Sequence, residues 1–101
     1  MTNDNNPSMQ RINDFHDAHH WRQYHNAKDL ALSISIESAE LLELFQWKDS
    51  HDVEERDRER LEEELADVLI YAYTLADKLN MDIDDIIEKK LKKNLVKYPV
   101  A

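Results

Sequence analysis

The chain has 101 residues, of which 35% are charged, and it carries a net charge of −9 with neither glycine nor cysteine. Without cysteine, the chain has neither disulfides nor thiolate metal sites. Its negative charge disfavours a nucleic acid polymer as a partner, because such polymers bind basic surfaces. The lack of glycine argues against a β-rich fold, because tight hairpin turns usually need glycine. No apolar stretch is long enough to span a membrane and no signal peptide is visible, so we expect a cytoplasmic protein without a membrane partner.

The chain is expected to form one all-α domain with four helices. Residues 1–7 are polar and are expected to form a disordered tail, and residues 8–101 are expected to form the domain. A first helix is predicted over residues 8–21, where Ser8 can cap the helix and apolar residues recur at helical spacing. A second helix is predicted over residues 27–48.

The third predicted helix covers residues 53–79, after a polar loop at residues 47–52. Its apolar residues follow one another in steps of four and three, which is the spacing of antiparallel helices packed in a bundle. These residues are Leu61, Leu65, Val68, Ala72, Leu75 and Leu79. A fourth helix is predicted over residues 83–96, with Asp82 as its N-cap and with lysines in its last turns, where they complement the helix dipole.

Two of these helices each carry a pair of carboxylates three residues apart, so both members of a pair lie on the same helix face. The pairs are Glu37 with Glu40 and Glu64 with Asp67. Glu37 occupies the apolar stripe of its helix, where an ionised carboxylate is costly unless it is paired or binds a metal. Four such carboxylates facing one another repel, and a hard divalent cation such as Mg²⁺ removes both problems. The four residues are therefore predicted metal ligands.

A salt-bridged surface and a di-iron site are the alternatives to a magnesium site at these carboxylates. A solvated, salt-bridged face is the usual role of acidic residues in a highly charged chain. Arg60 is within reach of Glu64, but the residues one turn from the first pair are not basic. These neighbours are Ser33, Leu41 and Leu44. A di-iron bundle normally uses Glu-x-x-His pairs, which neither pair matches.

The surroundings of the two pairs resemble the MazG-like nucleotide pyrophosphohydrolases and, within them, the dCTP-pyrophosphatase-like branch. The family pattern of Glu-x-x-Glu followed by Glu-x-x-Asp is present at residues 37–40 and 64–67. The segments A-E-L-L-E-L-F-Q-W at residues 39–47 and E-E-L-A-D-V-L-I-Y at residues 63–71 resemble the family's second and third helices. The C-terminal signature of the family is matched by Lys90, Asn94, Lys97, Tyr98 and Pro99.

This resemblance implies a four-helix MazG-like bundle that is completed by dimerisation, in a homodimer or a homotetramer. It also implies an Mg²⁺-dependent enzyme, with Mn²⁺ as a substitute ion, that hydrolyses a nucleoside triphosphate to the monophosphate and pyrophosphate. The branch suggests dCTP or a related or modified pyrimidine nucleotide as the substrate, and cleansing of the nucleotide pool as the role. A glutamate would act as the general base, with Glu37 and Glu40 as the first candidates.

Several residues outside the carboxylate pairs are candidates for binding the nucleotide. They are Trp21, His25, Trp47, Tyr71, Lys90, Asn94 and Tyr98. The tryptophans are able to stack on a base; ordinary packing is an equally common role for them, and the resemblance favours the base. Lys90 and Asn94, one turn apart, are expected to contact phosphate or nucleotide. The remaining histidines are expected to be solvated or structural, namely His16, His19, His20 and His51.

Two functions other than the hydrolase remain open from the residues. A non-catalytic helical interaction module would use the acidic face to bind a basic protein, and it would show no response to Mg²⁺. A metal-storing or redox bundle is disfavoured because neither carboxylate pair includes a histidine. Stabilisation by Mg²⁺ separates the hydrolase from the interaction module, since a ligand that binds only the native state must stabilise it.

Overall fold

The computed structural model describes residues 2–100, which form helices and turns and contain no strand. The elements in chain order are α1 (Pro7–Ala18), the short 3₁₀ helix η1 (Arg22–Tyr24), α2 (Ala27–Glu43), α3 (Ser50–Arg56), α4 (Arg58–Lys78) and α5 (Ile83–Lys97). The predicted all-α fold is therefore confirmed. No helix in the described range is long and apolar enough to cross a membrane.

Polar side chains cap α1, α2 and α5 at their N-termini. Asn6 accepts a hydrogen bond from the backbone N–H of Met9 at 3.1 Å, and Pro7 follows at the first helical position, where a proline loses no helical hydrogen bond. The predicted cap Ser8 instead lies inside α1. Asp82 caps α5 as predicted, by accepting a hydrogen bond from the backbone N–H three residues further on.

Three helices are followed by a residue with a left-handed backbone, a conformation that glycine usually takes at helix ends. Because the chain has no glycine, these positions are occupied by His20 (φ 57°) after α1, Trp47 (φ 61°) after α2 and Asn80 (φ 56°) after α4. Two helices end earlier than predicted. α1 ends at Ala18, just before the turn at His19 and His20, and α2 ends at Glu43, after which backbone hydrogen bonds three residues apart continue as far as Gln46. Histidine and tryptophan do not signal a helix end in a sequence.

The single helix predicted over residues 53–79 is in fact two helices. The first, α3, begins at Ser50 inside the predicted loop, and the chain leaves the helical region at Asp57 (φ −110°, ψ 27°) before α4 begins. Val53 has no exposed surface, so this side chain anchors α3 to the rest of the molecule. Helix-forming charged residues flank Asp57 on both sides, and the break therefore has no local sequence signal.

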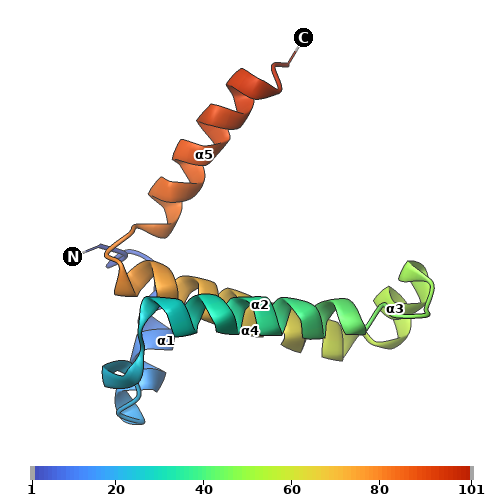
Figure 1. Cartoon of the computed structure of the whole chain (residues 1–101), viewed down its shortest axis with the longest axis horizontal. Coiled ribbons are helices and arrows are strands. Elements are labelled where there is room, and N and C mark those ends of the chain that lie inside the picture. Colours follow the sequence, from blue (N-terminus) through green and yellow to red (C-terminus); the bar gives the residue numbers. More distant parts are fainter. Residues whose placement is uncertain (1, 101) are drawn as a thin grey trace.

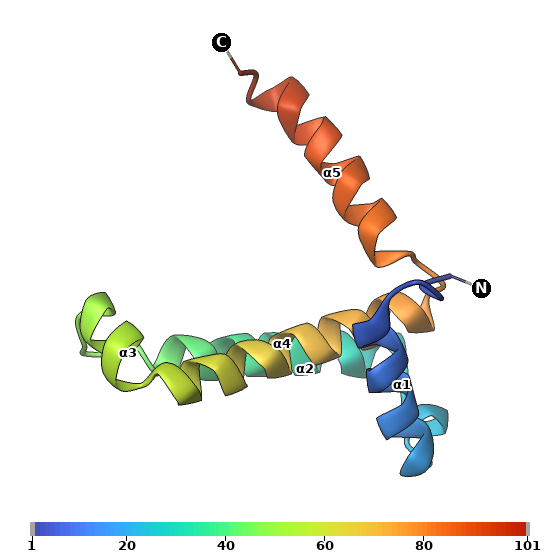
Figure 2. The same cartoon turned by 180° about the vertical axis from the view of Figure 1, so that it is seen from behind.

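α2 and α4 lie antiparallel and side by side, and α1 crosses α4 towards the C-terminal end of α4 (Figure 1 and Figure 2). Few hydrophobic residues are fully buried in the described part of the chain. They are Met9, Leu30, Leu44, Val53, Ala76 and Ile83. Large apolar side chains of the helix pair remain exposed, among them Leu32 and Ile36 of α2 and Leu65 and Leu69 of α4. The pair therefore keeps an uncovered apolar surface.

α5 projects away from the α2–α4 pair, and no other helix lies along it in either view (Figure 1 and Figure 2). Its large apolar side chains are exposed, namely Ile86, Ile87, Leu91, Leu95 and Val96. The molecule is correspondingly open. Its accessible surface is 8066 Å², against roughly 6,000 Å² for a compact monomer of this mass. Its radius of gyration is 16.2 Å, against about 13 Å for a compact domain of this length.

The start of the chain closes the corner between α4 and α5. Residues 2–5, part of the segment expected to be a tail, form turns, and Met1 lies outside the described residues. Asn3 is buried, and its side-chain amide donates to the carbonyl of Met81 at 2.9 Å. Its side-chain oxygen accepts a hydrogen bond from the backbone N–H of Ile83 at 2.8 Å. These contacts hold the first turn of α5 in its observed direction.

Candidate metal and nucleotide site

α2 and α4 bring the predicted carboxylates together between them. One carboxylate oxygen from each of Glu37, Glu40 and Glu64 lies within 4.8 Å of the other two. Asp67 is not part of this close trio, but its negative charge helps to raise the pKa of both Glu37 and Glu64. The antiparallel packing explains the arrangement, because residues three apart on each helix face the same side.

The carboxylates stand in an unfavourable electrostatic environment. Glu37 Oε2 and Glu64 Oε2 are buried without a hydrogen-bond partner among the described residues. Burial raises the pKa of Glu37, and a hydrogen bond to Glu40 and the charges of the neighbouring carboxylates raise it further. Burial likewise raises the pKa of Glu64, with repulsion from Glu40 and Asp67 as the next causes. Unpaired buried carboxylates are costly to keep ionised, so the site is unfavourable without a cation.

The donor set fits a hard divalent cation. The ligand atoms that converge are all carboxylate oxygens, the ligand type that Mg²⁺ prefers. The two buried oxygens without partners are acceptors that a cation would satisfy. None of the four carboxylates forms an ion pair with a basic side chain in the described range, so a salt-bridged face does not account for them.

A pocket of about 430 Å³ opens beside Asp67, between α1 and α4. We call it the aromatic pocket. It brings two of the predicted substrate residues, Trp21 and Tyr71, next to the carboxylates. Its other lining residues are Arg11, Ile12, Phe15, His16 and Ile70. A mostly apolar wall with a few polar groups is typical of sites that bind small organic ligands, and aromatic side chains offer flat surfaces to a nucleobase.

Among the histidines expected to be solvated or structural, His16 is buried and lines the aromatic pocket. Its ring lies 4.9 Å from the ring of His25 in an edge-to-face contact, and its Nδ1 has no partner among the described residues. Burial lowers the pKa of His16, and the neighbouring His25 lowers it further, so both favour the neutral form of the ring. The sequence offered no reason to single out this histidine among five.

Trp21 belongs to an aromatic cluster at the edge of the same pocket. Its ring centroid lies 4.6 Å from that of His19 and 5.7 Å from that of Phe15. Nearly half of the residue is exposed, so part of the indole is free to meet a ligand. His25, predicted in the same role, instead lines a neighbouring polar pocket together with Arg22 and Asp77.

The remaining predicted substrate residues neither line the aromatic pocket nor belong to the close trio of carboxylates in the same chain. Trp47 follows the end of α2 and is 93% exposed. Lys90 and Asn94 lie on α5 and Tyr98 directly follows it, and α5 points away from the α2–α4 pair (Figure 1). One copy of the chain therefore brings Trp21 and Tyr71 to the site, but not these four residues.

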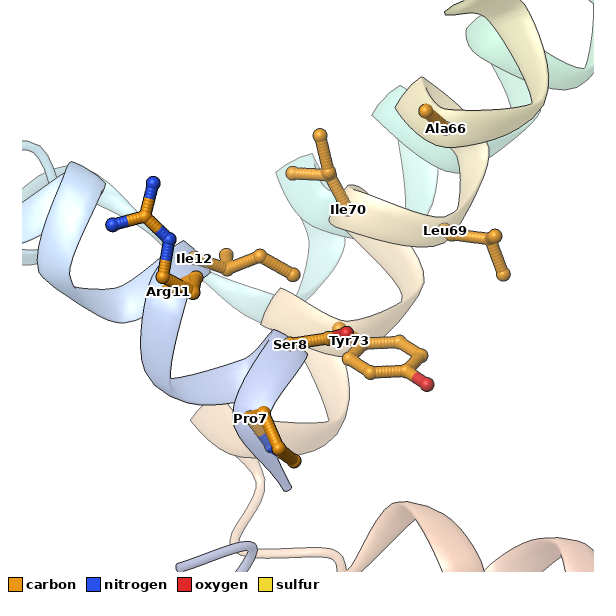
Figure 3. Close-up of a pocket in the computed structure, with 8 residues that line it drawn as sticks. All are labelled: Pro7, Ser8, Arg11, Ile12, Ala66, Leu69, Ile70 and Tyr73. Carbon is orange, nitrogen blue, oxygen red and sulfur yellow. The ribbon is translucent and has the colours of Figure 1, made fainter. Parts of the chain in front are cut away.

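A further groove of about 400 Å³ between α1 and α4 is apolar (Figure 3). Side chains from both helices border it, including Ile12 of α1 and Leu69 and Ile70 of α4. Its other lining residues are Pro7, Ser8, Arg11, Ala66 and Tyr73. The groove contains no carboxylate, so it offers no ligand for a metal ion.

The sequence of this chain is similar to those of known proteins. The MazG-like family model matches residues 32–101. The chain is 38% identical to dCTP pyrophosphatase 1 of Rattus norvegicus over 85 residues, which cover 79% of this chain and 50% of the relative. The human dCTP pyrophosphatase 1 is also 38% identical, over 84 residues that cover 78% and 49% of the two chains. The chain thus spans about half the length of the curated relatives it matches.

A solved structure is also similar. The crystal structure of a pyrophosphatase from Archaeoglobus fulgidus superposes with a TM-score of 0.81 at 44% sequence identity. The match covers 91% of this chain and 89% of the archaeal one. The similarity therefore extends over nearly the whole of both chains.

Proposed function

Because the chain belongs to the MazG-like family, we propose that it is a metal-dependent hydrolase that converts a nucleoside triphosphate to the monophosphate and pyrophosphate. The observation that carries the proposal is the trio Glu37, Glu40 and Glu64, whose ligand atoms lie within 4.8 Å of one another. Asp67, one helical turn from Glu64, lines the aromatic pocket. The names of the relatives, dCTP pyrophosphatases and a pyrophosphatase, support the same reaction class.

The trio and Asp67 would hold Mg²⁺, with Mn²⁺ as a substitute ion. When bound, the ion neutralises charge on the triphosphate and polarises a phosphoryl oxygen. α2 and α4 position the ligands of the ion, because each helix presents two of the four carboxylates towards the same space. A chain with a net charge of −9 repels a free triphosphate, and substrate binding therefore depends on these four side chains holding the cation.

Glu37 and Glu40 are the proposed general bases. Hydrolysis bonds a water oxygen to a phosphorus of the α–β anhydride and breaks the bond from that phosphorus to the bridging oxygen. The base takes a proton from the water. A carboxylate that takes this proton must be ionised and within hydrogen-bond reach of the water.

The base of the nucleotide would lie in the aromatic pocket, stacked on Trp21 and bordered by Tyr71. His25 would support this wall through its ring contact with His16. We favour dCTP, or a related or modified pyrimidine triphosphate, because the curated relatives are dCTP pyrophosphatases. The corresponding role is cleansing of the cytoplasmic nucleotide pool.

A second copy of the chain would complete the site, in a homodimer or a homotetramer. α5 exposes an apolar face, and the α2–α4 pair exposes another. A partner that covers both faces would also bring residues of one copy to the carboxylates of the other. The candidates are Trp47, Lys90, Asn94 and Tyr98, none of which lines the aromatic pocket of its own copy.

Product analysis tests the reaction. The purified chain is incubated with dCTP and with each of the other nucleoside triphosphates, in Mg²⁺ or in EDTA, and the products are separated by ion-exchange chromatography. Monophosphate plus pyrophosphate, formed only with Mg²⁺, is the expected result. Glu37→Gln should lower the rate by about 10²–10⁴-fold, whereas Glu63→Gln makes the same chemical change outside the four carboxylates and should not.

Two results would contradict the proposal. Diphosphate plus phosphate as products would exclude cleavage of the α–β anhydride. A folded chain that turns over no nucleotide in Mg²⁺ would exclude the enzyme and favour a non-catalytic interaction module with an acidic face.

A further inference from the structure

One face of α4 carries a cation, two carboxylates and a tyrosine in series. Arg60, Glu64, Asp67 and Tyr71 follow one another in steps of four, three and four residues, which places them on the same side of a helix. At 1.5 Å per residue, the series spans roughly 16 Å along the helix. The aromatic pocket adjoins Asp67 and Tyr71, so the carboxylates lie between this pocket and Arg60.

A second pocket, of about 410 Å³, opens at the Arg60 end of the series. We call it the cation pocket. It is lined by Glu40, Glu43, Leu44, Lys48, Arg60 and Glu64. Two of these residues, Glu40 and Glu64, belong to the trio whose ligand atoms converge. The cation pocket and the aromatic pocket therefore adjoin the carboxylates from opposite ends.

The two basic side chains of the cation pocket, Arg60 and Lys48, interact only weakly with other described residues. Arg60 forms no hydrogen bond or ion pair within the described range, and its influence on Glu64 is the smallest of the causes that set the pKa of that residue. Lys48 Nζ lies 3.4 Å from Asp57 Oδ2, with 54% of the lysine side chain exposed. Exposed ion pairs of this kind contribute little to stability, so both cations are available to an anion.

The charge of the cation pocket depends on a bound metal. Its three carboxylates and two cations give a net charge of −1, and one divalent ion on Glu40 and Glu64 changes this to +1. The anion that fits is a phosphate group, because a guanidinium donates two parallel hydrogen bonds to phosphate oxygens. A lysine adds a second positive charge beside it.

We infer that Arg60 and Lys48 bind the β- and γ-phosphates of the substrate and then the pyrophosphate product, an inference that rests on the proposed reaction. The nucleotide accordingly lies along α4, with its base at Tyr71 and Trp21 and its terminal phosphate at Arg60. The α–β anhydride lies between these ends, beside the carboxylates. Arg60 and Lys48 therefore contact the leaving group, which gains negative charge as the anhydride bond breaks.

Calorimetric titration with inorganic pyrophosphate tests this inference without turnover. The full-length chain in Mg²⁺ is titrated as the wild type, as Arg60→Gln and as Lys48→Gln. Arg58→Gln is the matched control, because Arg58 pairs with Glu62 at 3.4 Å outside the cation pocket and its loss changes the net charge equally. We expect Arg60→Gln to weaken binding about tenfold or more, and Lys48→Gln about threefold or more, as for hydrogen bonds to charged groups. Arg58→Gln should stay within about twofold of the wild type.

A second titration, with dCMP, tests the direction of the nucleotide. Because dCMP lacks the β- and γ-phosphates, Arg60→Gln should leave its affinity within about twofold of the wild type. Trp21→Ala should weaken dCMP binding, since it removes the stacking surface. A loss of dCMP affinity in Arg60→Gln as large as the loss for pyrophosphate would overturn the inference.

Two other outcomes would overturn it as well. One is a wild type that binds no pyrophosphate in Mg²⁺. The other is an equal loss in Arg58→Gln and Arg60→Gln, which would mark a long-range charge effect. Circular dichroism verifies that each variant keeps its helices. Since pyrophosphate binding needs no hydrolysis, an inactive wild type would refute the proposed reaction alone, and the titrations would still decide the role of Arg60.

Discussion

Glu37 and Glu64 each have one buried carboxylate oxygen that accepts no hydrogen bond from a described residue. The pKa of each residue is also raised. A group whose pKa is higher in the folded state than in the unfolded state binds protons more tightly when folded. Its contribution to stability is complete below the ordinary pKa of glutamate and is lost as the pH rises through the raised value. Without a metal, these two residues therefore oppose folding at neutral pH.

The substitution Glu64→Gln distinguishes two effects on stability: the cost of burying the Glu64 charge and the stabilisation by bound Mg²⁺. In EDTA at pH 7, we expect the variant to melt at a higher temperature than the wild type, because the amide removes a buried charge. The difference should shrink as the pH falls towards the ordinary pKa of glutamate. In Mg²⁺ at a hundredfold excess over Kd, the wild type should gain about 2.7 kcal/mol, on the order of 10 °C, and the variant much less.

Differential scanning calorimetry in EDTA and in Mg²⁺ measures both effects. Comparing the two proteins at each pH is necessary because burial lowers the pKa of His16 and of His25. Their contribution has the opposite sign, since it is lost as the pH falls, and it is common to both proteins. A wild type whose melting temperature does not respond to Mg²⁺ would contradict the metal site.

The sequence predicts the carboxylates better than it predicts their surroundings. Glu37 interrupts an apolar stripe, and the cost of burying a charge makes that interruption informative; the structure then brings it beside Glu40 and Glu64. His16 carries no such signal, because a histidine at an apolar position is compatible with simple packing. Trp47 is assigned to substrate binding by resemblance alone, and within one chain it is exposed.

At the level of elements, one carboxylate of α4 holds η1 in place by a hydrogen-bonded ion pair. Asp77 of α4 accepts a hydrogen bond from Asn13 of α1 at 3.2 Å and another from Arg22 of η1 at 3.1 Å. Arg22 also pairs with Asp17, which lies on α1. Asp77 is thus the residue that holds the segment carrying Trp21 against α4.

Asp77→Asn should loosen this segment. We expect the free energy of unfolding to fall by about 1.5–3 kcal/mol, the range for hydrogen bonds to a charged group, as measured by urea denaturation. In a Trp47→Phe background, Trp21 is the only tryptophan, and its emission should shift to the red. Asp17→Asn removes an ion pair of the same length without touching α4 and should leave both quantities near the wild type. Equal effects of the two substitutions would show that α4 is not the anchor.

The left-handed backbone at His20 offers a stabilising substitution. A non-glycine residue in this conformation costs about 1–2 kcal/mol, and glycine recovers part of that, less its greater entropy in the unfolded chain. We expect His20→Gly to raise the free energy of unfolding by up to about 1 kcal/mol in urea denaturation. His51→Gly places glycine in a helical backbone and should lower it. A loss of stability in His20→Gly would show that its side chain outweighs the strain.

The helices themselves were predictable from their apolar periodicity, whereas several of their ends were not. Asp82 and Asn80 are residue types that favour caps and turns, and the sequence indicates the α4–α5 corner for that reason. His20 and Trp47 have left-handed backbone conformations, which the sequence does not indicate at these residues. The chain also breaks at Asp57, between α3 with its buried Val53 and α4. A local pattern of helix formers does not predict such a break.

At the scale of the whole molecule, the chain exposes more surface than its mass requires. Its 8066 Å² exceeds the area of a compact monomer by on the order of 2,000 Å², which is comparable to the area that one subunit buries in a large obligate interface. Apolar periodicity predicts that a helix face becomes buried but not which chain buries it. This is why the sequence predicts the helices but not which molecule covers their exposed apolar faces.

Leu91→Glu tests whether α5 is part of such an interface. We expect the wild type to sediment at two or four times 12.0 kDa, and the variant to sediment as the monomer and lose activity, because a charge on the apolar face of α5 cannot be buried. Lys89→Glu changes the net charge more, on the opposite face of the same helix, and should leave the assembly intact. A wild type that sediments at 12.0 kDa would contradict the predicted oligomer.

The hydrogen bond between Asn3 and Ile83 joins residues eighty positions apart. Closing a loop of that length costs roughly 4 kcal/mol of chain entropy, so this bond forms after the intervening helices have docked and brought its two ends together. The hydrogen bonds of Asn3 therefore help to set the direction in which α5 leaves α4. The orientation of the surface that α5 offers to another molecule depends on the same contacts.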